Sequence, residues 1–182
     1  MKATAIGGKL NPLKCSITIP GATTITLKAL PDIDDSKDAS YEEESAIGRT
    51  QPFITYKNSG FRKIGLGLHF FITDDSEVAE IWGYIRALQS VVYPGPEKNG
   101  APYTPPAICS LMCGDIFKDT NGGNSVCAVC TNVGLKYDTS IAWDEKTYLP
   151  WKMDVNTSWH VVYLNSDLPG SDMILKLSQG EE

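Results

Sequence analysis

Alternation between apolar and polar residues predicts the two longest strands, because side chains in a strand point to opposite faces with a period of two. The first run covers 62–73, and its apolar positions are Ile64, Leu66, Leu68, Phe70 and Ile72. The second covers 151–163, and one face carries Trp151, Met153, Val155, Thr157, Trp159, Val161 and Tyr163. Shorter runs at 13–19, 23–30, 107–113 and 126–137 predict four further strands, of which the first two form a hairpin.

Between the two long runs the period changes to that of a helix over residues 76–92. Asp74 and Glu77 have the spacing of a capping box, and Pro94 ends the helix because it cannot donate a backbone hydrogen bond. The apolar stripe consists of Val78, Ile81, Trp82, Ile85, Leu88 and Val92. A helix cannot bury such a stripe alone, so we expect Trp82 to lie buried against the sheet.

These elements predict a mainly β protein with one flanking α-helix (α+β), in which an antiparallel sheet is curled or closed into a barrel. The chain has 182 residues, of which 42% are apolar and 21% charged, which fits a single globular domain over 1–182. Residues 57–60 predict a turn before the first long strand. Seven acidic residues and one basic residue lie between Asp32 and Glu44, so we expect an extended acidic loop at about 31–52.

The five cysteines raise the possibility of a zinc site, formed by the pairs Cys109/Cys113 and Cys127/Cys130. Within a strand Cys109 and Cys113 would be about 13 Å apart, and Cys127 and Cys130 would point to opposite faces. We therefore expect no metal and mostly buried thiols. A disulfide stays open as an alternative: if the chain turns near Thr120, Cys113 and Cys127 would face each other.

Candidate catalytic chemistry is sparse. The two histidines, His69 and His160, belong to no recognisable triad motif, and the glycines at 65 and 67 lie inside a strand, where they do not form a dinucleotide fingerprint. We expect no enzymatic activity and no cofactor. The net charge of −6 argues against a protein that grips nucleic acid phosphates. No apolar run is long enough to span a membrane and the first residues lack the apolar core of a signal peptide, which favours a cytoplasmic site of synthesis.

The order of elements over about residues 12–165 resembles the tail-tube-fold proteins of contractile-tailed bacteriophages. The likeness is greatest to the ring proteins that initiate the tube or form the baseplate hub. It is carried by short phrases at 30–41, 47–52, 62–71, 85–90, 105–109 and 148–155, the last of which begins Tyr148-Leu149-Pro150-Trp151.

This resemblance implies a structural virion protein, assembled in the host cytoplasm, that forms a hexameric ring at the junction of baseplate and tube and initiates or caps the tube. Its implied partners are further copies of itself, the neighbouring tail tube and baseplate hub proteins, and the tape-measure protein in the lumen. DNA would only pass through, and no membrane is involved. The alternatives are the tube protein itself, the equivalent ring of a phage-derived injection machine, or, from another class, a small β-barrel binding module.

The acidic segment is the candidate contact region of such a ring. Tyr41, Ile47 and Arg49 are unusual residues for a solvated loop, and the flanking stretch that ends in Pro52 and Phe53 looks anchored. We therefore expect the segment to dock on a neighbouring subunit or on the next ring, with Tyr41, Ile47, Arg49, Pro52 and Phe53 as contact residues. Arg49 would pair with an acidic group there, and Ile47 or Phe53 would fill an apolar site. A mobile loop on the surface of the same subunit is the alternative.

Overall fold

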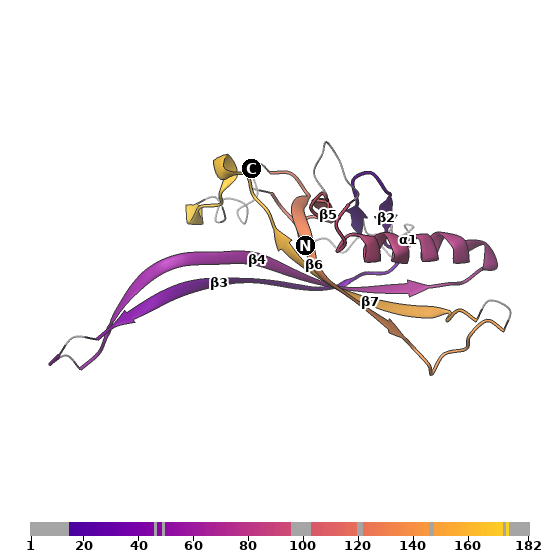
Figure 1. Ribbon diagram of the computed structural model, residues 1–182, viewed down its shortest axis with the longest axis horizontal. Helices are drawn as coiled ribbons and strands as arrows, with labels where there is room; N and C mark the ends of the chain where they lie inside the picture. Colours follow the sequence, from indigo (N-terminus) through magenta and orange to yellow (C-terminus); the bar gives the residue numbers. More distant parts are fainter. Residues whose placement is uncertain are drawn as a thin grey trace, which may run out of the picture.

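The computed structural model describes residues 15–45, 47–48, 50–95, 103–119, 122–145, 148–172 and 174. Within these residues, strands form one antiparallel seven-stranded sheet in the order β2-β1-β5-β6-β7-β4-β3 (Figure 1). The strands are β1 (Cys15–Thr18), β2 (Thr24–Thr26), β3 (Asp32–Glu44), β4 (Phe53–Phe71), β5 (Cys109–Cys113), β6 (Val126–Tyr137) and β7 (Lys152–Val161). The expected mainly β fold with a flanking helix is confirmed. The sheet stays open, so the closed barrel is wrong.

The core lies on one face of this sheet, where the predicted alternation placed it. Ile64 and Leu68 on β4 are almost completely buried, and so are Val155 and Trp159 on β7. β4 and β7 pair directly, with Ile64 opposite Trp159 and Leu68 opposite Val155. Both long alternating runs therefore form neighbouring central strands whose apolar faces coincide.

The predicted helix is present as α1 (Val78–Ser90), preceded by a 3-10 turn, η1 (Asp75–Glu77). The Asp74 carboxylate accepts a hydrogen bond from the Ser76 backbone N–H, whereas Glu77 bonds to Thr73 instead of closing a capping box. Ile81, Ile85 and Leu88 are buried against the sheet. Trp82 is only partly buried, at the edge of the core, where its ring stacks on that of Tyr137.

The N-terminal hairpin of β1 and β2 is also as predicted, and β1 in addition pairs with β5. That pairing places Cys15 opposite Cys113, and the two form a disulfide. The predicted bond between Cys113 and Cys127 is therefore wrong. The register of β5 and β6 sets Ser110, not Cys113, opposite Cys127, which is a free and exposed thiol.

The acidic segment is not a loop but a strand. β3 pairs with β4 over its whole length, and β4 begins at Phe53, well before the strand predicted from residue 62. At about 3.3 Å per residue, the 19 residues of β4 span about 60 Å. Residues 57–60, predicted as a turn, lie inside β4. The outer part of this hairpin extends far beyond the body (Figure 1), and we call residues 36–44 and 53–62 the arm.

Candidate docking surface

The arm is held together by charge. Aspartate, glutamate and serine have low strand propensity, yet β3 forms because its acidic side chains face basic ones on β4. Three ion pairs join the strands: Glu42–Lys57 lies within the arm, and Asp35–Arg62 and Asp38–Lys63 lie where the arm meets the body. The guanidinium of Arg62 contacts both carboxylate oxygens of Asp35, and this hydrogen bonding raises the pKa of Arg62. The other two pairs are exposed, and each contributes about 0.2–1 kcal/mol.

One side of the arm is aromatic and apolar. Tyr41 lies opposite Tyr56, with the two rings edge to face and their centroids 5.7 Å apart, and Glu43 lies opposite Ile54. Partners directly across an antiparallel pair share a face, so Tyr41, Ile54 and Tyr56 lie together, and we call these three residues the aromatic face. Their exposed fractions are 59%, 66% and 56%. Such a cluster left open to water is typical of an interaction surface.

The residues predicted to dock are spread along the outer part of the arm. Tyr41 belongs to the aromatic face, and Phe53, half exposed, is the first residue of β4. Ile47 is fully exposed in the turn that connects the strands, and Pro52 is exposed just before β4. Arg49 lies outside the described residues. Docking on a partner stays a prediction for all five residues.

Two members of the aromatic face, Ile54 and Tyr56, were missed by the sequence analysis. Their alternating pattern was present in the sequence, but residues 53–56 lie between the acidic loop expected at about 31–52 and the turn expected at 57–60, and no strand was predicted there. The predicted turn at 57–60 separated this stretch from the strand that follows. Gly60 was misleading, since here it serves a close approach: a Cβ at Gly60 would lie 3.3 Å from the backbone oxygen of Asp38.

Both edges of the sheet carry features that discourage pairing with another strand. β2, at one edge, has only three residues. β3, at the other, is acidic, and its register against β4 shifts twice, between Lys37 and Ala39 and between Ser40 and Tyr41. Short edges, charges and bulges are the usual means of blocking edge-to-edge association. The edge of β3 is therefore protected against pairing, whereas the aromatic face stays exposed.

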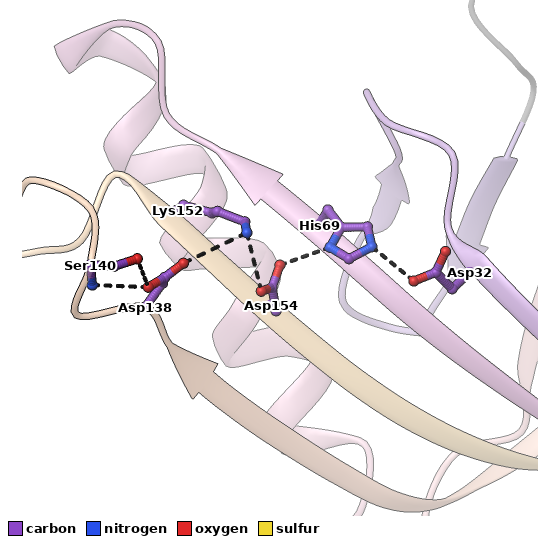
Figure 2. A network of polar contacts seen from close by, with 6 residues as sticks. All are labelled: Asp32, His69, Asp138, Ser140, Lys152 and Asp154. Carbon is purple, nitrogen blue, oxygen red and sulfur yellow. Dashed lines mark hydrogen bonds and ion pairs between the residues drawn. The ribbon is translucent and has the colours of Figure 1, made fainter.

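A network of polar contacts lies in the body, next to the first residue of β3 (Figure 2). His69 of β4 lies between two carboxylates: its Nδ1 is 2.7 Å from Asp154 Oδ1, and its Nε2 is 3.2 Å from Asp32 Oδ2. Lys152 Nζ is 3.5 Å from Asp154 Oδ2 and 3.7 Å from Asp138 Oδ2. These side-chain contacts thus link the first residue of β3 to β4, to β7 and to the segment after β6.

These contacts shift the pKa values of both His69 and Asp154. The hydrogen bond to Asp154, and to a smaller degree that to Asp32, raises the pKa of His69 above its ordinary value, although burial opposes the shift. The same bond to His69 lowers the pKa of Asp154, with help from Lys152. Near neutral pH the pair is therefore biased toward imidazolium and carboxylate.

Two of the three free thiols, Cys109 and Cys130, are buried and structural in character. Burial raises the pKa of Cys109 and of Cys130 to about 11, which suppresses the reactive thiolate. In the part of the chain that the structure describes, no group of three or more His, Cys, Asp or Glu side chains is placed to hold a metal ion. Nor do the described residues include a helix long and apolar enough to cross a membrane.

No family model matches the sequence, and no curated protein matches it. Two solved structures align with most of the chain. One is the tube-terminating cap of the anti-feeding prophage, at 8% identity over 86% of this chain and 91% of that chain, with a TM-score of 0.33. The other is the sheath/tube terminator, in the extended state, of the PVC extracellular contractile injection system, at 11% identity, 88% and 96% coverage and a TM-score of 0.34. Both TM-scores are below 0.5, so neither alignment establishes a shared fold or function.

Proposed function

We propose that this chain is a structural protein of a contractile phage tail, and that copies of it form a hexameric ring at the junction of baseplate and tube that initiates or caps the tube. The tube protein itself and the equivalent ring of a phage-derived injection machine are close variants of this proposal. The open sheet does not favour a small β-barrel binding module. Support comes from the resemblance of the sequence to tail-tube-fold proteins and from the arm.

The observation that carries the proposal is the aromatic face. A two-stranded ribbon in water is marginally stable at best, and this ribbon leaves Tyr41, Ile54 and Tyr56 more than half exposed. An exposed apolar surface of this kind promotes aggregation of a monomer, whereas in an assembly it can be buried against a neighbouring copy. When the arm of each copy contacts a different surface on the next copy, the contacts are heterologous, and a suitable rotation closes them into a ring.

The partners that we propose are those that the resemblance to tail-tube-fold proteins implies. Tail tube and baseplate hub proteins would contact the two ends of the ring, and the tape-measure protein would occupy its lumen. The net charge of −6 suits a channel through which DNA passes without binding. The role that we propose is not enzymatic: His69 is engaged by two carboxylates and His160 is stacked on Phe61, so both imidazoles have structural partners.

Association should depend on the aromatic face. Replacing Tyr41 and Tyr56 together by serine should weaken association about 30-fold or more, because buried aromatic anchors in interfaces contribute about 2 kcal/mol or more. The folded subunit should be little affected, since exposed substitutions usually change stability by no more than about 0.5 kcal/mol. Light scattering over a concentration series, alone and with tail tube protein, measures the association.

Thr55→Ser is the matched control, because Thr55 lies between Ile54 and Tyr56 in β4, on the opposite side of the arm, facing Glu42. This variant should assemble like the unmodified chain. A chain that stays monomeric in every mixture would contradict the ring. A double variant that associates as strongly as the control would contradict the role of the aromatic face.

A further inference from the structure

His69 makes a contact with each of its two ring nitrogens, and both contacts end on carboxylates (Figure 2). A neutral imidazole has one N–H donor and one lone pair. In that form one of the two contacts would direct a nitrogen lone pair at a carboxylate oxygen, which is repulsive. With both carboxylates ionised, only the imidazolium donates to Asp154 and to Asp32 at the same time, so the geometry favours the protonated form.

The charged groups around His69 come from several elements. Asp154 is shared with Lys152, and Lys136 of β6 lies opposite Asp154 in the register. On its other side His69 lines a cavity of about 180 Å³ that also contains Lys28, Glu77 and Glu80. Lys28 is paired with Glu77 at 2.6 Å. The charged residues that these contacts, the register and the lining of the cavity place around His69 are Asp32, Asp138, Asp154, Glu77, Glu80, Lys28, Lys136 and Lys152.

Asp32 is the member of this set whose position matters for the arm. It is the first residue of β3, an edge strand that pairs only with β4, and it lies opposite Gly67. A Cβ at Gly67 would lie 3.2 Å from Asp32 Cβ and 3.5 Å from Asn156 Oδ1, so the glycine lets the start of β3 lie close against β4 and β7. The side chain of Asp32 is otherwise 86% exposed.

We propose that His69 is a proton-dependent clasp at the start of β3, by which we mean a side chain that joins Asp32 and Asp154 only while it is protonated. As imidazolium it holds Asp32 and Asp154 together and fixes the start of β3 on the body. As neutral imidazole it keeps one partner, loses Asp32, and lets the start of β3 separate more readily from β4. This property belongs to the single chain and does not depend on ring formation.

The sign of the pH dependence follows from the direction of the pKa shift. The pKa of His69 in the folded chain is raised above the unfolded value of about 6.5. Stabilisation by the clasp is therefore complete below about pH 6.5 and is lost as the pH rises through the pKa of the folded form. Asp154 contributes stability with the opposite pH dependence. Because its pKa is lowered in the folded chain, its contribution is present above its unfolded pKa and is lost as the pH falls through its folded pKa.

An NMR titration of the full chain tests the clasp. The ring signals of His69 and the backbone amides of Ile33 and Asp34 should shift with one common midpoint above that of a free histidine. Asp32→Asn should lower this midpoint. Asp34→Asn, two residues further along β3 and opposite Gly65, should leave it unchanged.

A second measurement follows amide hydrogen exchange at the one of Ile33 and Asp34 whose N–H points to β4, since only alternate amides of an edge strand do so, corrected for the intrinsic effect of pH. Protection should fall as the pH rises through the His69 midpoint, and this fall should be absent in His69→Gln, which does not titrate. The clasp is overturned if the β3 amides do not respond at the His69 midpoint. It is also overturned if Asp32→Asn and Asp34→Asn shift that midpoint equally.

Discussion

Replacement of Trp159 by alanine should lower the free energy of unfolding by about 3–5 kcal/mol, the usual cost of removing a large aromatic side chain from a core. Trp159 is completely buried in β7, between β4 and β6. Its Nε1 donates to Thr157 Oγ1 at 2.8 Å, and that hydroxyl donates to the backbone oxygen of Leu66 at 3.2 Å. The substitution therefore leaves a cavity and removes a buried donor at the centre of the sheet. Urea denaturation measures the loss.

Trp82→Ala provides the comparison within the same chain. Trp82 lies at the edge of the core and stacks on Tyr137 with the ring centroids 6.5 Å apart. Its loss should cost clearly less than that of Trp159, because part of its surface is already in water and the stacking itself contributes about 0.5–1.5 kcal/mol. An equal or larger cost for Trp82→Ala would show that the centre of the core lies under the helix and not at β7.

Reduction of the disulfide between Cys15 and Cys113 should lower the free energy of unfolding by about 4–5 kcal/mol. The bond closes a segment with a sequence separation of 98 residues, and the chain-entropy model gives about this value for a loop of that length. Urea denaturation of the oxidised and reduced proteins measures the difference. Thiol titration of the unfolded, oxidised chain should find the three other cysteines, Cys109, Cys127 and Cys130.

Cys127→Ser separates this pairing from the one expected from the sequence. It should leave both the bond and the stability unchanged, because Cys127 is exposed and lies opposite Ser110. A peptide map in which Cys113 is linked to Cys127 would refute the pairing of β1 with β5 around Cys113. Equal stability of the oxidised and reduced chains would refute the stabilising role of the bond.

The sequence was most informative where burial alone determines the pattern. β7 and the inner half of β4 each have one face on the core, so their alternation predicted both the strands and the buried residues. The helix was predicted for the same reason, with Ile81, Ile85 and Leu88 on its buried side. In these elements the local pattern and the tertiary environment carry the same information.

The arm could not be predicted in this way because neither of its faces is buried by the chain. Asp35, Asp38 and Glu42 have little tendency to form strands, and what makes β3 a strand is their pairing with basic residues about 15–27 positions later. One signal was available: the acidic residues before the turn at 45–52 are followed by basic residues after it, as in a hairpin with charged partners on its two strands. Tyr41 and Phe53 were recognised as candidates for docking, whereas Ile54 and Tyr56 required the register.

The disulfide illustrates a different limit. A shift of three residues in a hairpin moves Ser110 into the place expected for Cys113, and nothing in the local pattern of 107–113 or 126–137 fixes that register. The true partner of Cys113 is Cys15 in β1, which precedes it by 98 residues. A pairing over such a distance depends on strand order, which periodicity does not contain.

The same strand order sets a schedule for synthesis. β1 and β2 emerge first from the ribosome, but β1 needs β5 beside it, and Cys113 follows Cys15 by 98 residues. At about 5–20 residues per second, this delay is about 5–20 s. During that time the apolar side chains of the first hairpin, among them Ile17 and Ile25, have no sheet to cover them. The newly made hairpin of β1 and β2 is therefore expected to expose apolar surface until β5 has been made.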